Sequence, residues 1–426
     1  MKWLSTNIIN QARIIRYRKP VKQSIPQSKT QQSQLVNQVY FAPHFFRFYL
    51  TFILSFCSIE HASVSFEKSV LACTATHNEK TGIMLKSYDW HDGAGVLYFN
   101  PKGIKRHTFP HESLRGKQSG RSLAHAWYSR FASVSFNQYG RGFPNGGMNE
   151  RGLAIEVLWL NETEYTERDQ RPYVNELEWV QYVLDTCENV EQVEALLSKV
   201  RISPIHGQVH YFFCDQSGRC GALEFIKGDT KLYLNELQTP SLTNHSYEQS
   251  IAYAREQQRM GKLTRTEEIP RQVKQGHRGS LARFLSAQKI SKSEVITSLQ
   301  LGLKALDQVK IKGYTKWQIA YDLKHLELAF KTSKSSKTRQ VSFSHLIGRL
   351  KALSLPTEGC SAIMSYSLFR KETGALSSFF TPPTFEQERA HLRQRFARLK
   401  LPKQLADALA THGKHCSDLV HDSTKH

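Results

Sequence analysis

Short stretches in which apolar and polar residues alternate recur along the chain, separated by turn residues. Residues 73–77 and 83–88 are two such stretches, and Asn78-Glu-Lys-Thr-Gly82 between them has turn composition, which predicts a β-hairpin. A second turn, Gly147-Met-Asn-Glu-Arg-Gly152, is expected to open a strand at 153–160. Further strands are predicted at residues 131–136, 209–214, 220–226, 231–234, 317–321 and 326–331.

Helical periodicity interrupts these strands. Residues 175–187 and 190–200 carry apolar positions three or four apart, and Asn189 is placed to cap the second helix. Another helix is predicted at 280–290. Strands interrupted by a pair of helices indicate sheets packed on each other with helices outside. From about residue 350 the pattern changes, and residues 385–410 are typical of charged helices appended to this core.

The first 72 residues differ from the rest of the chain, and we expect them to be a leader. Residues 46–59 form a short apolar run behind a basic region that has no acidic residue, which is the order of a secretory signal. A buried helix is the alternative reading of this run. No stretch of the chain is apolar for long enough to predict a membrane span. The protein is therefore expected to be exported, to the periplasm or out of the cell.

Two cleavage positions are open, and both lead to the same new terminus. Signal peptidase could cut near residues 62–65 and leave a short propeptide that removes itself, or it could cut directly after Ala72. Either route exposes Cys73 as the first residue. A lipoprotein site at Leu71-Ala72-Cys73 is the competing interpretation, but it lies too far behind the apolar run, and lipidation would consume the thiol.

The chain is strongly basic, with 58 Lys and Arg against 37 Asp and Glu and a formal net charge of +21. The basic residues at the two ends match no nucleic-acid-binding module, so no nucleic-acid partner is expected. An attraction to anionic membrane lipid or to acidic polymers stays open.

The seven cysteines lack the paired spacing of metal ligands, so neither a zinc site nor another metal or cofactor is expected. In an exported chain, Cys214 and Cys220 could bridge a hairpin and Cys360 could reach Cys416. Free buried thiols are the alternative, and the sequence does not choose between them.

Seven short motifs follow one another between residues 72 and 324. The motifs are Ala72-Cys73-Thr74, Tyr88-Asp89-Trp90, Gly147-Met-Asn-Glu-Arg-Gly-Leu153, Leu242-Thr-Asn244-His-Ser, Ala282-Arg283-Phe284, Thr315-Lys-Trp317 and Tyr321-Asp-Leu-Lys324. In type and order they resemble the motifs of the choloylglycine hydrolase and penicillin V acylase family, and the resemblance covers residues 73 to about 350. The resemblance implies an α+β fold, the four-layer αββα sandwich of N-terminal-nucleophile hydrolases, with a leader at 1–72, the hydrolase domain at 73–350 and a C-terminal helical extension of unknown role at 351–426.

The resemblance also implies that Cys73 is an N-terminal nucleophile. A free thiol titrates near ~8.5 and an α-amine near ~7.7–8, so a terminal cysteine carries its own base and needs no histidine. Asp89 matches the aspartate that holds the terminal amine. Lys86 stands where the family has an arginine. The lysine keeps the positive charge near the thiol but lacks the planar guanidinium group that can donate two parallel hydrogen bonds. Arg283 matches the second family arginine.

Asn244 matches the oxyanion-hole asparagine of the family. The second donor would be the backbone N–H of Trp159, and an aromatic residue there resembles the penicillin V acylases more than the bile salt hydrolases. The Trp159 side chain, in a Leu-Trp-Leu strand, has a plainer alternative as a core residue.

The expected activity is hydrolysis of linear, non-peptide amides through a thioester on Cys73. Small N-acyl amides such as penicillin V or N-acyl homoserine lactones are the expected substrates, and conjugated bile salts are the alternative. A catalytically inactive, secreted binding protein on the same fold is the alternative of another class. Members of the family are often tetramers, so the resemblance allows a homo-oligomer.

Overall fold

The computed structural model describes residues 13–15, 72–114, 125–234, 237–261, 279–368, 376–383, 389–390, 392–393, 395–396 and 401–411. All of them belong to one structural unit, Met1–Arg16 with Val70–His426. The predicted signal run at 46–59 and cleavage sites at 62–65 lie outside the described residues. In the described part of the chain, no helix is both long and apolar enough to cross a membrane.

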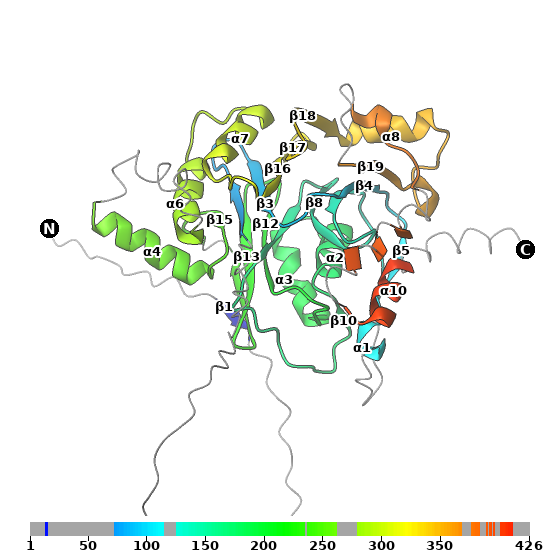
Figure 1. Ribbon diagram of the computed structural model, residues 1–426, viewed down its shortest axis with the longest axis horizontal. Helices are drawn as coiled ribbons and strands as arrows, with labels where there is room; N and C mark the ends of the chain where they lie inside the picture. The colour runs from blue at the N-terminus through cyan, green and yellow to red at the C-terminus, as the bar shows by residue number, and fades with distance from the viewer. Residues whose placement is uncertain are drawn as a thin grey trace, which may run out of the picture. The chain divides into compact units, whose positions relative to one another are not determined.

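Two large antiparallel sheets form the centre of the fold (Figure 1). The larger has nine strands in the order β1 (Arg13–Ile15), β14 (Asp229–Leu234), β13 (Cys220–Ile226), β12 (Val209–Cys214), β9 (Ala154–Trp159), β8 (Pro144–Asn149), β7 (Ser133–Asn137), β4 (Val96–Asn100) and β19 (Met364–Ser367). The smaller has six strands in the order β15 (Ser241–Leu242), β2 (Ala72–His77), β3 (Ile83–Asp89), β16 (Thr315–Asp322), β17 (Glu327–Thr332) and β18 (Ser335–Ser342).

Two pairs of short strands lie outside the large sheets. β10 (Tyr173–Val174) pairs in parallel with β11 (Arg201–Ile202), and β5 (Lys105–His107) pairs antiparallel with β6 (Ala126–Tyr128). The remaining helical elements are α1 (His111–Leu114), α4 (Tyr247–Arg259), α8 (Phe343–Ala352), α10 (Lys403–Thr411), η2 (Leu306–Gln308), η3 (Cys360–Ala362) and η4 (Leu376–Phe379).

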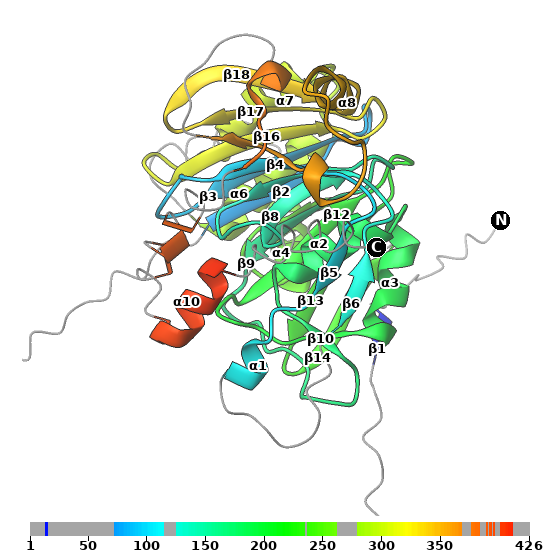
Figure 2. The same cartoon turned by 90° about the vertical axis from the view of Figure 1, so that its right-hand side faces the viewer.

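The sheets stack on each other and helices cover their outer faces (Figure 2). Side chains of both sheets, including Phe136 and Ile319, form the core between them. Helices α2 (Glu178–Thr186) and α3 (Val190–Lys199) pack on the larger sheet. Helices α6 (Ser280–Ser291) and α7 (Leu299–Ala305) pack on the smaller one. This order of layers confirms the predicted αββα sandwich.

The predicted hairpin is confirmed by β2 and β3, which pair with Cys73 opposite Tyr88. Alternation along β2 sends its side chains to two different layers. Cys73 and Ala75 belong to the core between the sheets. Thr76 faces the other way, and its hydroxyl donates to the carbonyl of Ala287 in α6 at 3.2 Å. Folding therefore directs the Cys73 thiol inward, between the sheets.

One predicted turn was too long. Gly147 to Asn149 belong to strand β8, and the chain turns only at residues 150–152, where Gly152 has a φ of +73°. A Cβ atom at Gly147 would lie 2.4 Å from the Val134 carbonyl oxygen. Glycine therefore allows close strand packing at this position, and its turn-like composition was misleading.

Several elements have no clear periodicity and were not predicted. Strand β18 is polar, with the sequence SSKTRQVS, and helix α4 is almost as polar but begins with a capping box between Ser246 and Gln249. In the region expected to be a helical extension, Met364–Ser367 forms β19 at the edge of the nine-stranded sheet, and α10 is helical. Tertiary pairing stabilises β18 and β19 where local pattern does not.

The cysteines divide into bonded and free ones. Cys214 and Cys220 form a disulfide between β12 and β13. Cys360 is also disulfide-bonded, and its expected partner Cys416 lies outside the described residues. Cys73 and Cys187 are free and buried.

Candidate active site

The Cys73 side chain lies at a cavity of about 750 Å³, open mouth included. Most of the lining is aromatic or aliphatic, and Tyr88, Trp90 and Trp159 contribute to it. The rings of Trp90 and Trp159 lie 5.8 Å apart between centroids. An apolar cavity with a nucleophilic side chain in its wall is the usual form of a small-molecule site.

Asn244 and Arg283 hold the backbone of Cys73 from both sides. The Cys73 N–H donates to Asn244 Oδ1 at 2.7 Å, and the Arg283 guanidinium donates to the Cys73 carbonyl at 2.5 Å. Arg283 also donates to Asn244 Oδ1 at 2.8 Å, so that the three residues form one closed network. This network restrains Cys73 on both sides of its Cα atom.

Helix α6 supplies two of the groups that build this network. The Ser280 hydroxyl accepts the Asn244 N–H at 2.7 Å and donates to Thr243 Oγ1 at 2.9 Å. Arg283 follows three residues later, one helical turn along the same face. The spacing of Ser280 and Arg283 in the sequence thus allows one helix to fix both the backbone and the side chain of Asn244.

Asp89 lies across the hairpin from the peptide bond that precedes Cys73. In the strand register Asp89 is opposite Ala72, and the side chain is fully buried. Oδ1 accepts hydrogen bonds from the hydroxyls of Ser87, at 3.1 Å, and Thr315. Oδ2 has no hydrogen-bond partner in the part of the chain that the structure describes. Burial raises the pKa of Asp89 to about 6, against the opposing effects of Arg283, the two hydroxyls and Lys86.

Lys86, which stands where the family has an arginine, is buried between the sheets. The sequence did not predict this burial. Its ammonium lies 3.3 Å from Glu156 Oε2 of the opposite sheet and also donates to the Val157 carbonyl. Tyr321 donates to the same carboxylate at 2.6 Å. Gly146 makes room for this pair, because a Cβ atom there would lie 2.2 Å from the Glu156 carboxyl carbon. Lys86 therefore joins the two sheets beneath the site.

The Cys73 thiol is held in its neutral form while the chain is continuous. Burial raises the pKa of Cys73, and the charge of Asp89 acts in the same direction. The positive charges of Lys86 and Arg283 and the hydrogen bond from the thiol to the Asp89 carbonyl oppose this rise only in part. A buried thiol of raised pKa is a poor nucleophile until a base takes its proton.

Trp159 contributes to the site through its backbone and its ring. Asn244 Nδ2 donates to the Trp159 carbonyl at 2.7 Å. Trp159 is opposite Val209 in β12, and the adjacent Leu160 N–H donates to the Gln208 carbonyl at 2.9 Å. In an antiparallel ladder this pattern turns the N–H and C=O of Trp159 away from β12, toward the side on which Asn244 lies.

The structure thus brings Cys73, Asp89, Asn244, Arg283 and Trp159 together, with Lys86 beneath them. It also reveals supporting groups that were not predicted. His210 Nδ1 lies 2.8 Å from Glu224 Oε1, and Nε2 lies 2.7 Å from the carbonyl of Thr243, the residue before Asn244. These contacts connect the residue before Asn244 to strands β12 and β13 of the nine-stranded sheet. Polar residues within otherwise apolar strands were the available signal for this pair.

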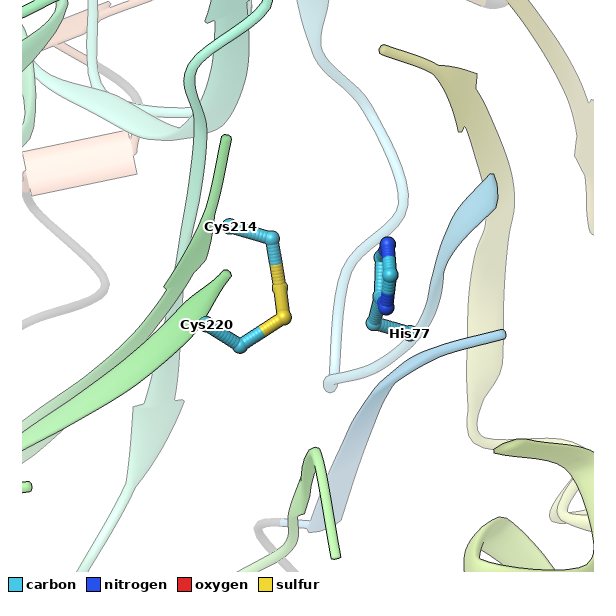
Figure 3. A group of neighbouring side chains, drawn as sticks. All are labelled: His77, Cys214 and Cys220. Atoms are coloured by element: carbon cyan, nitrogen blue, oxygen red, sulfur yellow. A yellow bond between two sulfur atoms is a disulfide. The ribbon is translucent and has the colours of Figure 1, made fainter. Parts of the chain in front are cut away.

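One group of potential metal ligands occurs among the described residues, at His77, Cys214 and Cys220 (Figure 3). The two sulfur atoms are bonded to each other, so neither is a thiolate. Burial lowers the pKa of His77 to about 4. As long as the disulfide is formed, this cluster does not have the donor set of a zinc site.

Comparisons with known proteins agree on one class. The family model described as linear amide C-N hydrolases, choloylglycine hydrolase family, matches residues 136–260. A penicillin V acylase of Pectobacterium atrosepticum is 25% identical over 217 residues, which are 46% of this chain and 55% of the relative. The match thus spans about half the length of that curated relative.

Solved structures share the fold. Penicillin V acylase from Agrobacterium tumefaciens superposes with a TM-score of 0.58 and 21% identity, covering 74% of this chain and 98% of its own. A mutant of the conjugated bile acid hydrolase from Clostridium perfringens gives a TM-score of 0.52 and 13% identity, covering 71% of this chain and 97% of its own.

The resemblance predicted from the motifs is confirmed. The chain is similar to the linear amide C-N hydrolases of the choloylglycine hydrolase family, whose model matches residues 136–260. Of the two solved structures, the penicillin V acylase of Agrobacterium tumefaciens is more similar to this chain than the bile acid hydrolase of Clostridium perfringens is, in both identity and TM-score.

Proposed function

We propose that this chain is the precursor of a cysteine hydrolase of linear, non-peptide amides, activated when cleavage after Ala72 frees the α-amine of Cys73. The observation that carries the proposal is the position of Cys73. Its thiol lies at an apolar cavity, and Asn244 and Arg283 hold its backbone on both sides. Structural cysteines do not require such a network.

The unpaired oxygen of Asp89 supports the cleavage step. Among the described residues, Asp89 Oδ2 is buried without a hydrogen-bond partner, although buried polar atoms are nearly always hydrogen-bonded. The peptide bond between Ala72 and Cys73 lies across the hairpin from Asp89. Hydrolysis of that bond would create an ammonium group beside this carboxylate and give the unpaired oxygen a charged hydrogen-bond donor.

The mechanism then needs only groups of this chain and water. The α-amine of Cys73 takes the thiol proton, and the thiolate attacks the amide carbonyl carbon. The tetrahedral intermediate collapses, the C–N bond breaks, and the amine of the leaving group receives the proton. Water attacks the resulting thioester, releasing the carboxylic acid and regenerating the thiol.

In this mechanism, two donors stabilise the oxyanion. The Asn244 side-chain amide has two N–H bonds, of which one is donated to the Trp159 carbonyl. The second N–H remains for the developing oxyanion, together with the backbone N–H of Trp159, which is turned away from β12. Fixed donors of this kind lower the barrier because they need no reorganisation during the reaction.

The same proposal extends to substrate class and compartment. The aromatic lining suits a phenoxyacetyl or fatty acyl group, so small N-acyl amides are the proposed substrates. Disulfides at Cys214–Cys220 and at Cys360 support export to an oxidising compartment. The basic net charge supports attraction to anionic surfaces, and the resemblance to the family supports assembly into a homo-oligomer.

Activity should fall as the pH drops through about 6. Asp89 must be ionised to pair with the α-ammonium group, and its pKa in the precursor is about 6. The ammonium group lowers this pKa further, so the loss of kcat/KM that Asp89 causes should lie at or below pH 6. It lies below the limb of the α-amine, which must be unprotonated to act as the base and ordinarily titrates near ~7.7–8. A pH–rate profile of the mature enzyme checks this expectation, and a profile with no further loss of kcat/KM below pH 6 would contradict the role of Asp89.

The variant Asp89→Asn provides the matching control. Its kcat/KM should be ~10–100-fold lower, the usual effect of losing a charged hydrogen bond. The folded-state pKa lies above the ordinary 3.8, so the proton stabilises the fold below pH 3.8 and that contribution is lost as the pH rises through about 6. In the uncleaved chain, where Asp89 has no ammonium partner, the Asn variant should therefore melt no earlier than wild type at pH 8. A lower kcat/KM of the mature variant then reflects loss of function and not loss of fold.

A side-by-side assay should rank four substrates. Mature enzyme should cleave penicillin V or a long-chain acyl homoserine lactone with higher kcat/KM than glycocholate or taurocholate, because the flat wall at Trp159 suits an aromatic or aliphatic acyl group better than a steroid. Trp159→Ala should erode this preference, and Trp159→Tyr should largely keep it. Preference for the bile salts would overturn the substrate class. No hydrolysis of any amide by a chain that begins at Cys73 would favour an inactive binding protein.

A further inference from the structure

Apolar side chains near the C-terminus line the cavity that holds Cys73. Phe396, Leu401 and Leu409 are part of the lining, although they lie more than three hundred residues from Cys73 in the sequence. Leu392 and Leu405 are buried in the same hydrophobic cluster. We refer to these five residues as the C-terminal wall. Leu405 and Leu409 lie four residues apart in α10, so that one face of that helix points inward.

The C-terminal wall packs on loops that surround the cavity. The cluster joins it to Phe109 and Phe143, and the Tyr139 ring stacks on Phe396 with an interplanar angle of 26°. Gly140 has a φ of +102°, and a Cβ atom there would lie 2.9 Å from Leu392 Cδ1. α10 also contacts α1, which follows Phe109 (Figure 2). These contacts seat the wall closely against the hydrolase core.

A buried arginine ties the wall to the loop that follows the catalytic strand. Arg395 donates to the Ala94 carbonyl at 2.6 Å and lies 3.5 Å from Asp92 Oδ2. Residues 90–94 directly follow β3, and Trp90 in this loop lines the cavity. By contrast, Arg393 is half exposed and pairs with Asp407 at 3.6 Å, away from the buried cluster. The segment therefore has a lining face and a solvent face.

We propose that the C-terminal wall determines which acyl groups the enzyme accepts, by limiting the length of the chain that fits beside Phe396, Leu401 and Leu409. This inference deepens the proposed function and rests on it for the identity of the reaction. It assigns a role to the region after residue 350, whose sequence alone indicated only charged helices. Each methylene of an acyl chain that finds room in the cavity strengthens binding roughly fourfold, so a small change in volume shifts selectivity strongly.

Binding of product acids tests the wall separately from the reaction. The probes are straight-chain carboxylic acids from butanoic to dodecanoic acid and phenoxyacetic acid, titrated calorimetrically into the full chain with Cys73→Ser. Adding Phe396→Ala should move the tightest binder to a longer acid, with about fifteenfold tighter binding where two more methylenes fit. Leu401→Phe, at a half-buried position, should move the optimum to a shorter acid.

The matched control is Arg393→Gln, on the solvent face of the same segment, which should leave the length profile unchanged. Melting temperatures show which variants fold, and Phe396→Leu replaces Phe396→Ala should the latter not fold. Unchanged profiles in both folded wall variants, or no binding of any acid, would overturn the proposal. If the wall variants shift the length profile but the wild-type protein hydrolyses no amide, the role of the C-terminal wall in acyl binding stands. The proposed hydrolase activity is then rejected.

Discussion

Replacing Cys73 with alanine should abolish amide hydrolysis, lowering kcat on the order of 10⁴-fold or more. The thiol is the acyl acceptor in the proposed mechanism, and none of the other described cysteines lines the cavity. The variant should fold normally, because alanine suits a buried strand position and removes only the sulfur atom. Turnover of the preferred amide, measured beside the melting temperature, checks both expectations.

The first residue of the mature wild-type chain should be determined in the same experiment. Intact mass and Edman sequencing of active enzyme should give a chain that begins Cys-Thr-Ala-Thr-His. A propeptide that removes itself should remain attached in Cys73→Ala, whereas cleavage by signal peptidase after Ala72 should leave processing intact. Activity from a chain that still carries residues before Cys73 would contradict the mechanism, since its base would be a peptide nitrogen.

Replacing Asn244 with alanine should lower kcat by roughly a hundredfold or more, the usual effect of removing one oxyanion donor. The side chain accepts from the Cys73 N–H and from Arg283 and donates to the Trp159 carbonyl, so it also orders the site. Asn244→Asp should be worse still, because it places a negative charge against the developing oxyanion. Wild-type turnover in Asn244→Ala would mean that another group stabilises the intermediate.

A second asparagine separates catalysis from stability. Asn189 caps α3, accepting from the Gln192 N–H at 3.2 Å. Asn189→Ala should cost about 1 kcal/mol of unfolding free energy and leave kcat unchanged. Urea unfolding and turnover of both variants should therefore give opposite patterns. A similar loss of turnover in both would attribute the effect of Asn244→Ala to folding.

Local patterns in the sequence predicted much of the scaffold. Alternation identified the hairpin of β2 and β3, and the ranges 209–214 and 220–226 agree with β12 and β13 to the residue. The helix predicted from residue 175 begins at Glu178, since the Asn175 side chain accepts the N–H groups of Leu177 and Glu178 before the first turn. Such patterns succeed because they report contacts between residues close in the chain.

The sequence by itself also determined which residues gather at the site. A cysteine behind an expected leader, followed at family spacings by Asp89, Asn244 and Arg283, identified groups that the fold brings together. It could not predict their environment. The raised pKa of Asp89, the pairing of Lys86 with Glu156 and the support of Thr243 by His210 all depend on burial and on groups from other layers.

Only the tertiary structure decided how the cavity is closed. Phe396 and Leu409 have no local feature that relates them to Cys73, and residues around them read as charged helices. In the structure, Arg395 and the cluster with Phe143 hold these side chains against the loops that line the cavity. Chemistry follows from residue types and spacing, which the sequence carries. The shape of the cavity depends on packing between distant segments, which no local pattern encodes.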